Sequence, residues 1–259
     1  MDLFLKNKRV LVTGSSKGIG RSIVEEFLKE GASAIITGRS QMSLDQTYEN
    51  LSTNYSKQRI FTHAGDLTVG AEIEQCLNFT DQVFGGLDVL VLNIGSGKSS
   101  PGLKADLFEW ERMFKINYWG AITFVKEAIP LLKRGVDPNV VFIGSIAGVE
   151  YIGAPVSYSA AKAALTVSAQ SIASIVASDG IRINVIAPGN VKFPGGRWEE
   201  IQRERPEMVE ELLETKVPQK RFASPQEVAD LVLFVASTRA SFITGSVFTI
   251  DGGQSLRYL

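Results

Sequence analysis

Seven short runs rich in β-branched and apolar residues recur along the chain, and longer stretches with helical periodicity separate them. The runs read RVLVT, SAIIT, RIFTHA, LDVLVLN, NVVFIGS, IRINVIAP and SVFTI, and helix-like stretches such as 18–30, 68–84 and 155–178 lie between them. Short buried strands that alternate with helices form a parallel sheet covered on both faces. The sequence therefore predicts an α/β fold with a doubly wound parallel sheet of about seven strands.

Size and charge fit one small-molecule-binding domain. With 259 residues and 44% hydrophobic composition the chain can bury a substantial core, so we predict a single domain over 1–259. The 27 basic and 28 acidic residues nearly cancel, which argues against nucleic acid or an anionic membrane as partner. We find no apolar run near membrane-spanning length and no secretory signal pattern, so we expect a cytoplasmic protein.

Cysteine and histidine usage excludes several classes of site. Cys76 is the single cysteine and His63 the single histidine. An intrachain disulfide, a multi-cysteine or multi-histidine metal site and a histidine-based catalytic triad are therefore excluded. The acidic residues within 199–214 alternate with arginines and predict a solvated helix face, so we expect no metal. His63 ends a strand, where a structural role is expected.

A glycine-rich loop follows the first strand and opens the first helix. It reads T-G-S-S-K-G-I-G over 13–20, the context in which a glycine pattern indicates dinucleotide binding. Gly14 would permit the tight turn, Gly18 the approach of a pyrophosphate, and Gly20 close packing of helix on strand. Taken alone, the motif fits an ordinary βα turn equally well. The candidate cofactor contacts in the loop are Gly14, Ser16, Lys17, Gly18, Ile19 and Gly20.

The end of the second strand favours NADP(H). Many NAD-binding sheets carry an acid here for the ribose hydroxyls, but this chain reads T-G-R-S at 37–40. Arg39, together with Lys17, could pair with a ribose 2′-phosphate. If each charge-assisted bond contributes about 1.5–3 kcal/mol, NADP(H) should be preferred on the order of tenfold or more. The alternative is that Arg39 is only a solvated loop residue.

Two further strand ends belong to the same predicted crevice, because open α/β sheets bind ligands beyond the carboxyl ends of their strands. Asp66 and Leu67 follow the third strand, where a carboxylate and an amide could meet an adenine. Asn93 and Gly95 follow the fourth, where the chain could pass close to the adenosine ribose. Each alone is more often a turn than a binding site, and their common location favours binding.

With these motifs, the chain resembles the short-chain dehydrogenase/reductase family over essentially its whole length. The matching residues are Thr13, Gly14, Gly18, Gly20, Asp66, Asn93, Gly95, Asn117, Ser145, Tyr158, Lys162, Pro188 and Gly189. The resemblance implies a Rossmann-type fold and an oxidoreductase that uses NADP(H). It also implies a homo-oligomer, a tetramer or a dimer, formed by the long helices expected over 105–133 and 155–178.

Tyr158 and Lys162 lie four residues apart and so share one face of a helix. A nearby ammonium stabilises phenolate and should lower the pKa of Tyr158 toward neutral pH, as an acid/base catalyst requires. The resemblance assigns Ser145 to the substrate oxygen, and Lys162 also to the nicotinamide ribose. It assigns Asn117 to a bound water beside the lysine.

The chain departs from the family pattern after Pro188 and Gly189. Many members carry a threonine that bonds the nicotinamide carboxamide where this chain has Phe193, so only backbone groups around Val191 remain for that bond. The segment 190–220 is expected to form a loop and short helices over the substrate. Trp198 within it fits a pocket wall and a packing anchor equally well.

Two classes of function stay open. The favoured one is an NADP(H)-dependent reductase of a carbonyl or secondary-alcohol substrate, with 3-oxoacyl thioesters as one candidate beside steroids, sugars and small ketones. The alternative is a non-catalytic NADP(H)-binding module that senses redox state or binds a partner. A pure binder has no need of the proton donor Tyr158, which argues against that alternative. Substrate identity, stereochemistry and direction depend on the shape of the variable segment.

Overall fold

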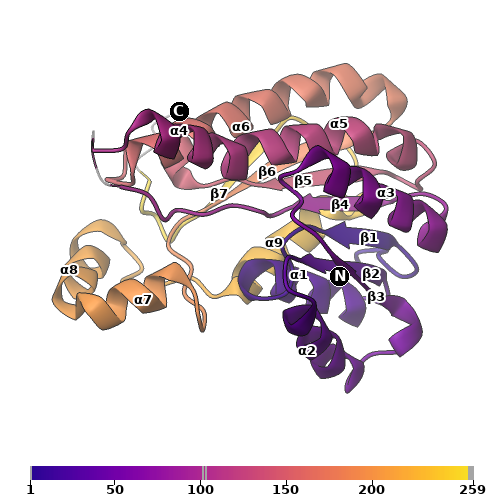
Figure 1. The fold of residues 1–259 in the computed structure, drawn as a ribbon, viewed down its shortest axis with the longest axis horizontal. Helices are drawn as coiled ribbons and strands as arrows, with labels where there is room; N and C mark the ends of the chain where they lie inside the picture. The colour runs from indigo at the N-terminus through magenta and orange to yellow at the C-terminus, as the bar shows by residue number, and fades with distance from the viewer. Residues whose placement is uncertain (1, 101, 103, 256–259) are drawn as a thin grey trace.

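The computed structural model describes residues 2–100, 102 and 104–255, and across these residues a parallel sheet runs through the molecule (Figure 1). Its seven strands follow the order β3-β2-β1-β4-β5-β6-β7. They are β1 (Arg9–Val12), β2 (Ser33–Gly38), β3 (Ile60–Ala64), β4 (Val89–Leu92), β5 (Asn139–Ile143), β6 (Arg182–Pro188) and β7 (Val247–Ile250). The predicted α/β fold with a seven-stranded, doubly wound sheet is confirmed.

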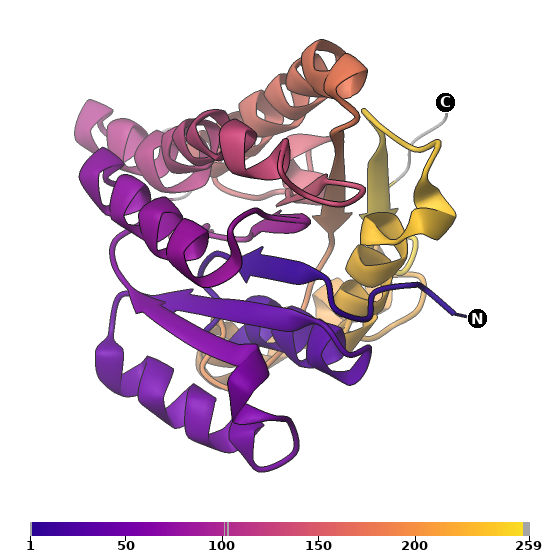
Figure 2. The same ribbon diagram turned by 90° about the vertical axis from the view of Figure 1, so that its right-hand side faces the viewer.

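Helices cover both faces of the sheet (Figure 2). The helices are α1 (Gly18–Lys29), α2 (Gln41–Ser52), α3 (Gly70–Phe84), α4 (Leu107–Phe114), α5 (Gly120–Leu132), α6 (Val156–Val176), α7 (Arg197–Glu204), α8 (Pro206–Lys216) and α9 (Pro225–Ala236). Residues of α1, α2 and α9 form one hydrophobic core with the sheet, and residues of α3, α5 and α6 form the other. Helices α7 and α8 stand apart from both layers (Figure 1).

Alternating strand residues supply the two cores. In β1, Val10 and Val12 belong to the core beneath α1 and α9, whereas Leu11 belongs to the core beneath α3 and α5. All three are fully buried, which explains why the strand reads as a continuous apolar run. Each such side chain stabilises the fold by about 1.5–3 kcal/mol relative to exposure.

Glycines lie just beyond two of the predicted helices. Gly31 has φ 86° just beyond α1, and Gly180 has φ 75° after the short helical turn that extends α6. Both lie in the left-handed region, which glycine adopts without steric cost.

The long helix expected over 105–133 is instead interrupted. Helix α4 passes into a π-helical turn, Lys115–Trp119, before α5 begins. The buried Asn117 in this turn accepts a hydrogen bond from the Ser96 amide at 2.9 Å and donates to the Ser96 carbonyl at 3.1 Å. Such tertiary contacts, rather than local propensity, accompany the change in helical pitch.

Helix α6 corrects the expectation that no apolar run approaches membrane-spanning length. By length and composition alone, Val156–Asp179 would suffice to cross a membrane, with 24 residues and a mean hydropathy of 1.3. One such helix is weak evidence, since core helices pass the same test. Here Ala161, Leu165 and Ala169 are buried, the latter two within the core beside β5 and β6.

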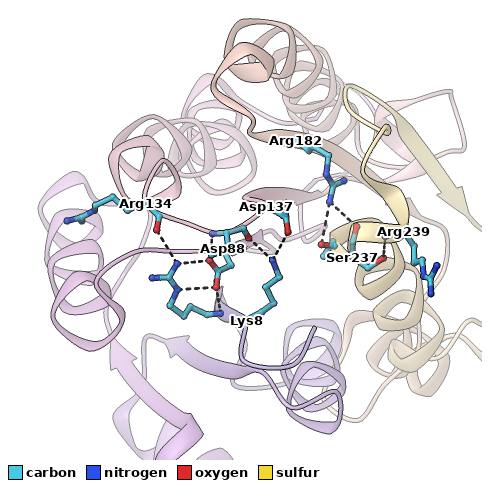
Figure 3. A network of polar contacts seen from close by, with 10 residues as sticks. Lys8, Asp88, Arg134, Asp137, Arg182, Ser237 and Arg239 are labelled. Carbon is cyan, nitrogen blue, oxygen red and sulfur yellow. Dashed lines mark hydrogen bonds and ion pairs between the residues drawn. The ribbon is translucent and has the colours of Figure 1, made fainter. Parts of the chain in front are cut away.

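Charged residues near the amino ends of the strands form two groups of polar contacts, one around Asp88 and one around Arg182 (Figure 3). Asp88, whose side chain is 3% exposed, accepts hydrogen bonds from the Arg9 amide at 2.8 Å and from both sides of its guanidinium at 3.0 and 2.6 Å. Nearby, Lys8 donates to the Val136 carbonyl at 2.6 Å. Arg182 donates to the carbonyls of Val235 and Ser237 near the end of α9, at 2.9 and 3.1 Å. This edge of the sheet is therefore densely cross-linked.

Candidate functional site

The opposite, carboxyl edge of the sheet opens into a cavity of about 1100 Å³. Most of the residues predicted to bind cofactor or substrate line it: Gly14, Ser16, Lys17, Ile19, Arg39, Asp66, Leu67, Asn93, Gly95, Ser145, Tyr158, Lys162, Pro188, Gly189 and Val191. Gly18, Gly20 and Asn117 are not among the wall residues. The topology thus gathers these scattered positions into one place, as the strand-end argument predicts.

The glycines of the 13–20 loop are required for different geometric reasons. Gly14 and Gly18 have φ of 62° and 59°, so a side chain at either would be strained. Gly20 has an ordinary backbone conformation, but a Cβ there would lie 2.6 Å from the side-chain nitrogen of Asn93 and 2.6 Å from the carbonyl oxygen of Gly14. The close approach of helix and strand therefore excludes any larger residue at position 20.

Asn93 fixes the shape of this loop. Its side-chain nitrogen donates to the carbonyls of Thr13 and Gly14, at 3.1 and 2.9 Å, and its backbone amide donates to the Thr13 hydroxyl at 2.9 Å. The side chain thus contacts protein backbone, and its neighbour Ile94 faces the cavity. Asn93 is a loop anchor in this structure.

Arg39 follows β2 and lines the cavity as a cation without an ion pair among the described residues. Its side chain is exposed, and the described residues give it no acidic partner. The following Ser40 caps α2 by accepting a hydrogen bond from Ser43 at 3.3 Å. Lys17, which precedes α1, lies with its Nζ 3.5 Å from the Gly195 carbonyl. An anion placed between the loop and β2 would meet a guanidinium without a competing carboxylate.

Asp66 shapes the turn after β3. Its Oδ1 accepts hydrogen bonds from the Thr68 amide at 3.1 Å and the Thr68 hydroxyl at 2.8 Å, while the Asp66 amide donates to Glu72 at 3.3 Å. Oδ2 has no partner among the described residues, which leaves it available to a donor such as an amino group in the cavity.

Ser145, Tyr158 and Lys162 all line the cavity. Ser145 follows β5, and its hydroxyl, which hydrogen-bonds with the Tyr158 phenol, also accepts from the Ala147 amide at 3.2 Å. Lys162 donates from Nζ to the Ile143 carbonyl at 2.8 Å. A Cβ on Gly95 would lie 3.1 Å from that Nζ, so only glycine leaves this space open beside the lysine.

Burial controls the electrostatics of the pair. It raises the pKa of Tyr158, and the hydrogen bond with Ser145 offsets this only partly. Burial also lowers the pKa of Lys162 to about 8. The prediction that Lys162 depresses the pKa of Tyr158 is therefore wrong for this structure. Spacing along the helix places the two side chains on one face, but removal from water decides the direction of both pKa shifts.

The segment after Gly189 covers one side of the cavity. Val191 pairs with Ala223 in an isolated parallel bridge, and the ring of Phe193 packs so close to Gly18 that a Cβ there would lie 2.6 Å from it. Phe193 thus replaces a hydrogen-bonding side chain with an apolar contact across the glycine loop.

Both interpretations of Trp198 apply. It lines the cavity, and its ring lies 5.3 Å from that of Phe222, measured between centroids. The pocket wall is therefore held in place by aromatic packing.

Sequence reasoning missed several residues of the cavity wall, including Arg112, Met208 and Gln254. Gln254 follows β7, so the strand-end argument used for the other loops could have found it. Met208 lies within 190–220, the segment expected to cover the substrate, although it was not singled out, and Arg112 lies on α4, where no local sequence signal marks its approach to the site.

His63 and Cys76 lie outside the cavity. The His63 ring is 5.5 Å from that of Phe79, and burial lowers its pKa, as fits the structural role expected. Burial raises the pKa of Cys76 to about 12, which makes it a poor nucleophile. Among the described residues, no group of three His, Cys, Asp or Glu side chains could hold a metal ion.

Known proteins are similar to this chain in sequence and in fold. Residues 14–255 match the family described as "Enoyl-(Acyl carrier protein) reductase". The isoepoxydon dehydrogenase patN of Penicillium expansum is 32% identical over 96% of this chain and 95% of its own. The 3-oxoacyl-[acyl-carrier-protein] reductase FabG of Aquifex aeolicus is 30% identical over 98% and 100%.

A solved structure agrees. The L-sorbose reductase of Gluconobacter frateurii, in complex with NADPH and L-sorbose, superposes with a TM-score of 0.93 at 28% identity, and 100% of each chain is covered. The glycine cradle, the strand-end residues and these similarities lead to one conclusion: this chain belongs to the short-chain dehydrogenase/reductase family and is an oxidoreductase that acts on CH–OH or carbonyl groups with a nicotinamide cofactor.

Proposed function

We propose that the chain is an NADP(H)-dependent carbonyl reductase in which Tyr158 is the proton donor. The observation that carries this proposal is the meeting of Ser145, Tyr158 and Lys162 in one cavity, at the same sheet edge as the glycine loop and the unpaired Arg39. The runner-up, a non-catalytic NADP(H)-binding sensor, would need only the loop and Arg39.

The residues divide the chemistry among them. When bound, the cofactor supplies the hydride that adds to the carbonyl carbon. Ser145 holds the carbonyl oxygen by a hydrogen bond, and Tyr158 gives that oxygen its proton, so that a secondary alcohol forms. Lys162, beside Gly95, would hold ribose hydroxyls. Asn117 would keep the segment at Ser96 in position through its two backbone hydrogen bonds.

The pKa directions favour reduction. A raised pKa keeps the Tyr158 phenol protonated at neutral pH, which is the form that donates to a developing alkoxide. Oxidation of an alcohol would require the phenolate, which burial disfavours. Lys162, with a pKa of about 8, remains mostly protonated at pH 7.

We further propose a preference for NADP(H) over NAD(H). Arg39 lacks an acidic partner among the described residues, and the stretch 38–40 carries no carboxylate that would repel a 2′-phosphate or hold free ribose hydroxyls. The solved L-sorbose reductase complex contains NADPH, which supports the same choice here.

The substrate is a small carbonyl compound or its alcohol. The named substrates of similar proteins range from isoepoxydon to 3-oxoacyl thioesters and L-sorbose, so similarity favours no one of them. Reduction of a 3-oxoacyl thioester stays one candidate.

The test is NADPH consumption against a panel of 3-oxoacyl thioesters, quinones, sugars and steroids. Tyr158→Phe should lose turnover while binding NADPH as before. Tyr151→Phe is the matched control, because Tyr151 is 88% exposed and lies outside the cavity. Equal turnover by the Tyr158→Phe enzyme would refute the catalytic assignment, and tight NADPH binding without turnover of any panel member would favour the sensor.

We also propose a homo-oligomer. Trp119, Val167 and Ile175 are 56%, 62% and 73% exposed on the helical layer that contains α5 and α6, an apolar surface that a second copy of the chain could cover. Light scattering at a mass above 28.2 kDa supports this proposal, and the mass of one chain overturns it.

A further inference from the structure

A second hollow of about 540 Å³ adjoins the cavity at its mouth. Ser99, Arg112 and Arg197 line both spaces, so among the described residues the two are continuous. The outer hollow lies between the loop before α4 and the start of α7. These elements are far apart in sequence, and the ion pair between Lys98 and Glu200 joins them at 3.2 Å.

The outer hollow is rich in cations. Its wall contains Lys98, Lys104, Arg112 and Arg197 against the acids Asp106 and Glu109. Asp106 caps α4 by accepting from the Glu109 amide at 2.8 Å, and Glu109 is paired with Arg112 through two hydrogen bonds of 2.7 and 2.8 Å. These acids are therefore already engaged within α4. Besides Asp106, the carboxylate of Glu200 lies between two of the remaining cations, Lys98 and Arg197.

The Glu200 carboxylate shows which ligand this arrangement suits. Its two oxygens lie 3.2 Å from the Lys98 Nζ and 2.9 Å from an Arg197 nitrogen, and these cations lower its pKa. Two cations from opposite rims thus already hold one oxyanion. Because the side chains of Lys98 and Arg197 are 70% and 44% exposed, another oxyanion can reach them from solvent. It would exchange with Glu200 at little cost, because exposed ion pairs contribute little to stability.

The inner cavity provides the contrasting environment. Ile146, Ile152, Met208 and Leu212 line it together with Tyr158 and Ser145. A ligand that spans both spaces would need an apolar body inside and a negative charge at the mouth.

We propose that the substrate carries, apart from its reactive carbonyl, an oxyanion such as a carboxylate, phosphate or sulfonate, which Arg197 and Lys98 bind in exchange for Glu200. The inference rests on the proposed reductase activity and deepens it, since it names the substrate class of the same site. Arg112 completes the wall of the anion subsite, and its own pairing with Glu109 holds it in place.

The first arm of the test is kinetic. Medium-chain (ω−1)-keto carboxylates and their methyl esters, matched in chain length, are compared at low ionic strength. The wild-type protein should have a KM several-fold lower for the acid than for the ester, with a similar kcat. Arg197→Gln and Lys98→Gln should remove this advantage, whereas Glu200→Gln should strengthen it. An (ω−1)-keto alkyl phosphate series distinguishes a phosphate from a carboxylate as the preferred anion.

The matched control is Arg203→Gln. Arg203 is an exposed arginine of the same helix α7 and lines neither space. Its exchange should leave the preference for acids unchanged. A loss of preference equal to that of Arg197→Gln would show a general effect of charge and overturn the subsite.

The second arm needs no turnover. Fluorescence titration compares 8-anilinonaphthalene-1-sulfonate with N-phenyl-1-naphthylamine, which has the same ring system without the sulfonate. Tighter binding of the sulfonate that Arg197→Gln weakens and Arg203→Gln does not supports the anion subsite, even if no ketone is reduced and the proposed function fails. Equal KM values for acids and esters, together with equal affinities for the two fluorescent probes, overturn the inference. The reductase assignment stays intact in that case if neutral ketones are reduced.

Discussion

The two edges of the central sheet use charge in opposite ways. At the amino edge, Asp88 accepts four hydrogen bonds, from Arg9 and the Val136 amide, so its buried carboxylate is fully compensated. At the carboxyl edge, Lys162 is buried with one carbonyl partner, and its pKa falls to about 8. The charges at the amino edge stabilise the fold. At the carboxyl edge, burial disfavours the charged forms of Tyr158 and Lys162. Perturbed groups in a cleft are typical of catalytic sites.

The largest effect expected is on the reaction itself. Tyr158→Phe should lower kcat by about 10²–10⁴, the usual contribution of a general acid. It should not reduce the free energy of unfolding appreciably, because the phenol hydroxyl is held only by Ser145 among the described residues. Turnover assays with urea unfolding check both expectations. A large loss of stability would mean that Tyr158 at the carboxyl edge also stabilises the fold. The contrast between a stabilising amino edge and a functional carboxyl edge would then be wrong.

The next effect concerns the amino edge. Asp88→Ala leaves the Arg9 guanidinium without its carboxylate and should cost about 2–4 kcal/mol of unfolding free energy, somewhat below the figure for a wholly buried pair because Arg9 is 23% exposed. Asp45→Ala, an exposed acid on α2, is the control and should change stability by less than about 0.5 kcal/mol. Equal costs for the two variants would contradict the importance of the network.

The same carboxylate predicts an acid dependence. Burial opposes ionisation of Asp88, but the hydrogen bonds from Arg9 and Val136 prevail and hold its pKa below the ordinary 3.8. Its stabilisation is therefore complete above that value and is lost as pH falls through the lower folded-state pKa. Wild-type and Asp88→Ala proteins should converge in stability in strong acid, as urea titrations at several pH values would show.

Lys162 should give the opposite pH slope. Its pKa is about 8 in the folded chain against an ordinary 10.5, so between these values the unfolded chain binds the extra proton and stability rises with pH. Lys162→Met should thus be about 1–3 kcal/mol more stable than wild type at pH 7, less the lost bond to Ile143, and the difference should change between pH 8 and pH 10. A difference in unfolding free energy that stays constant across this pH range would argue against a lowered pKa of Lys162.

The smallest effect expected is on cofactor choice. Arg39→Ala should weaken NADPH binding on the order of tenfold while leaving NADH binding nearly unchanged, since one charge-assisted contact is lost. Titration of both cofactors decides it. Equal weakening of both would mean that Arg39 shapes the loop rather than reads the phosphate.

The strands and much of the carboxyl edge could be predicted from sequence, because apolar runs and the residues that follow them are local signals, whereas the network at the amino edge was not predicted. All seven strands were readable as apolar runs, and the strand ends located most of the cavity wall. The interruption of the helix at Asn117 could not be predicted, because it accompanies hydrogen bonds to Ser96, 21 residues away in the sequence. The pKa direction of Tyr158 also escaped prediction: a lysine four residues on is visible in the sequence, but the extent of burial is not. The cation-rich mouth depends on Lys98 meeting Glu200 across 102 residues.

The two hydrogen bonds from Asn93 to the glycine loop have a consequence for the thermodynamics of cofactor binding. Because the protein itself orders Thr13 and Gly14, the conformational entropy of these residues is lost on folding and need not be lost again when a dinucleotide arrives. Asn93→Ala would move that loss to the binding step. Affinity would then fall through a less favourable binding entropy, even though Asn93 need not touch the ligand.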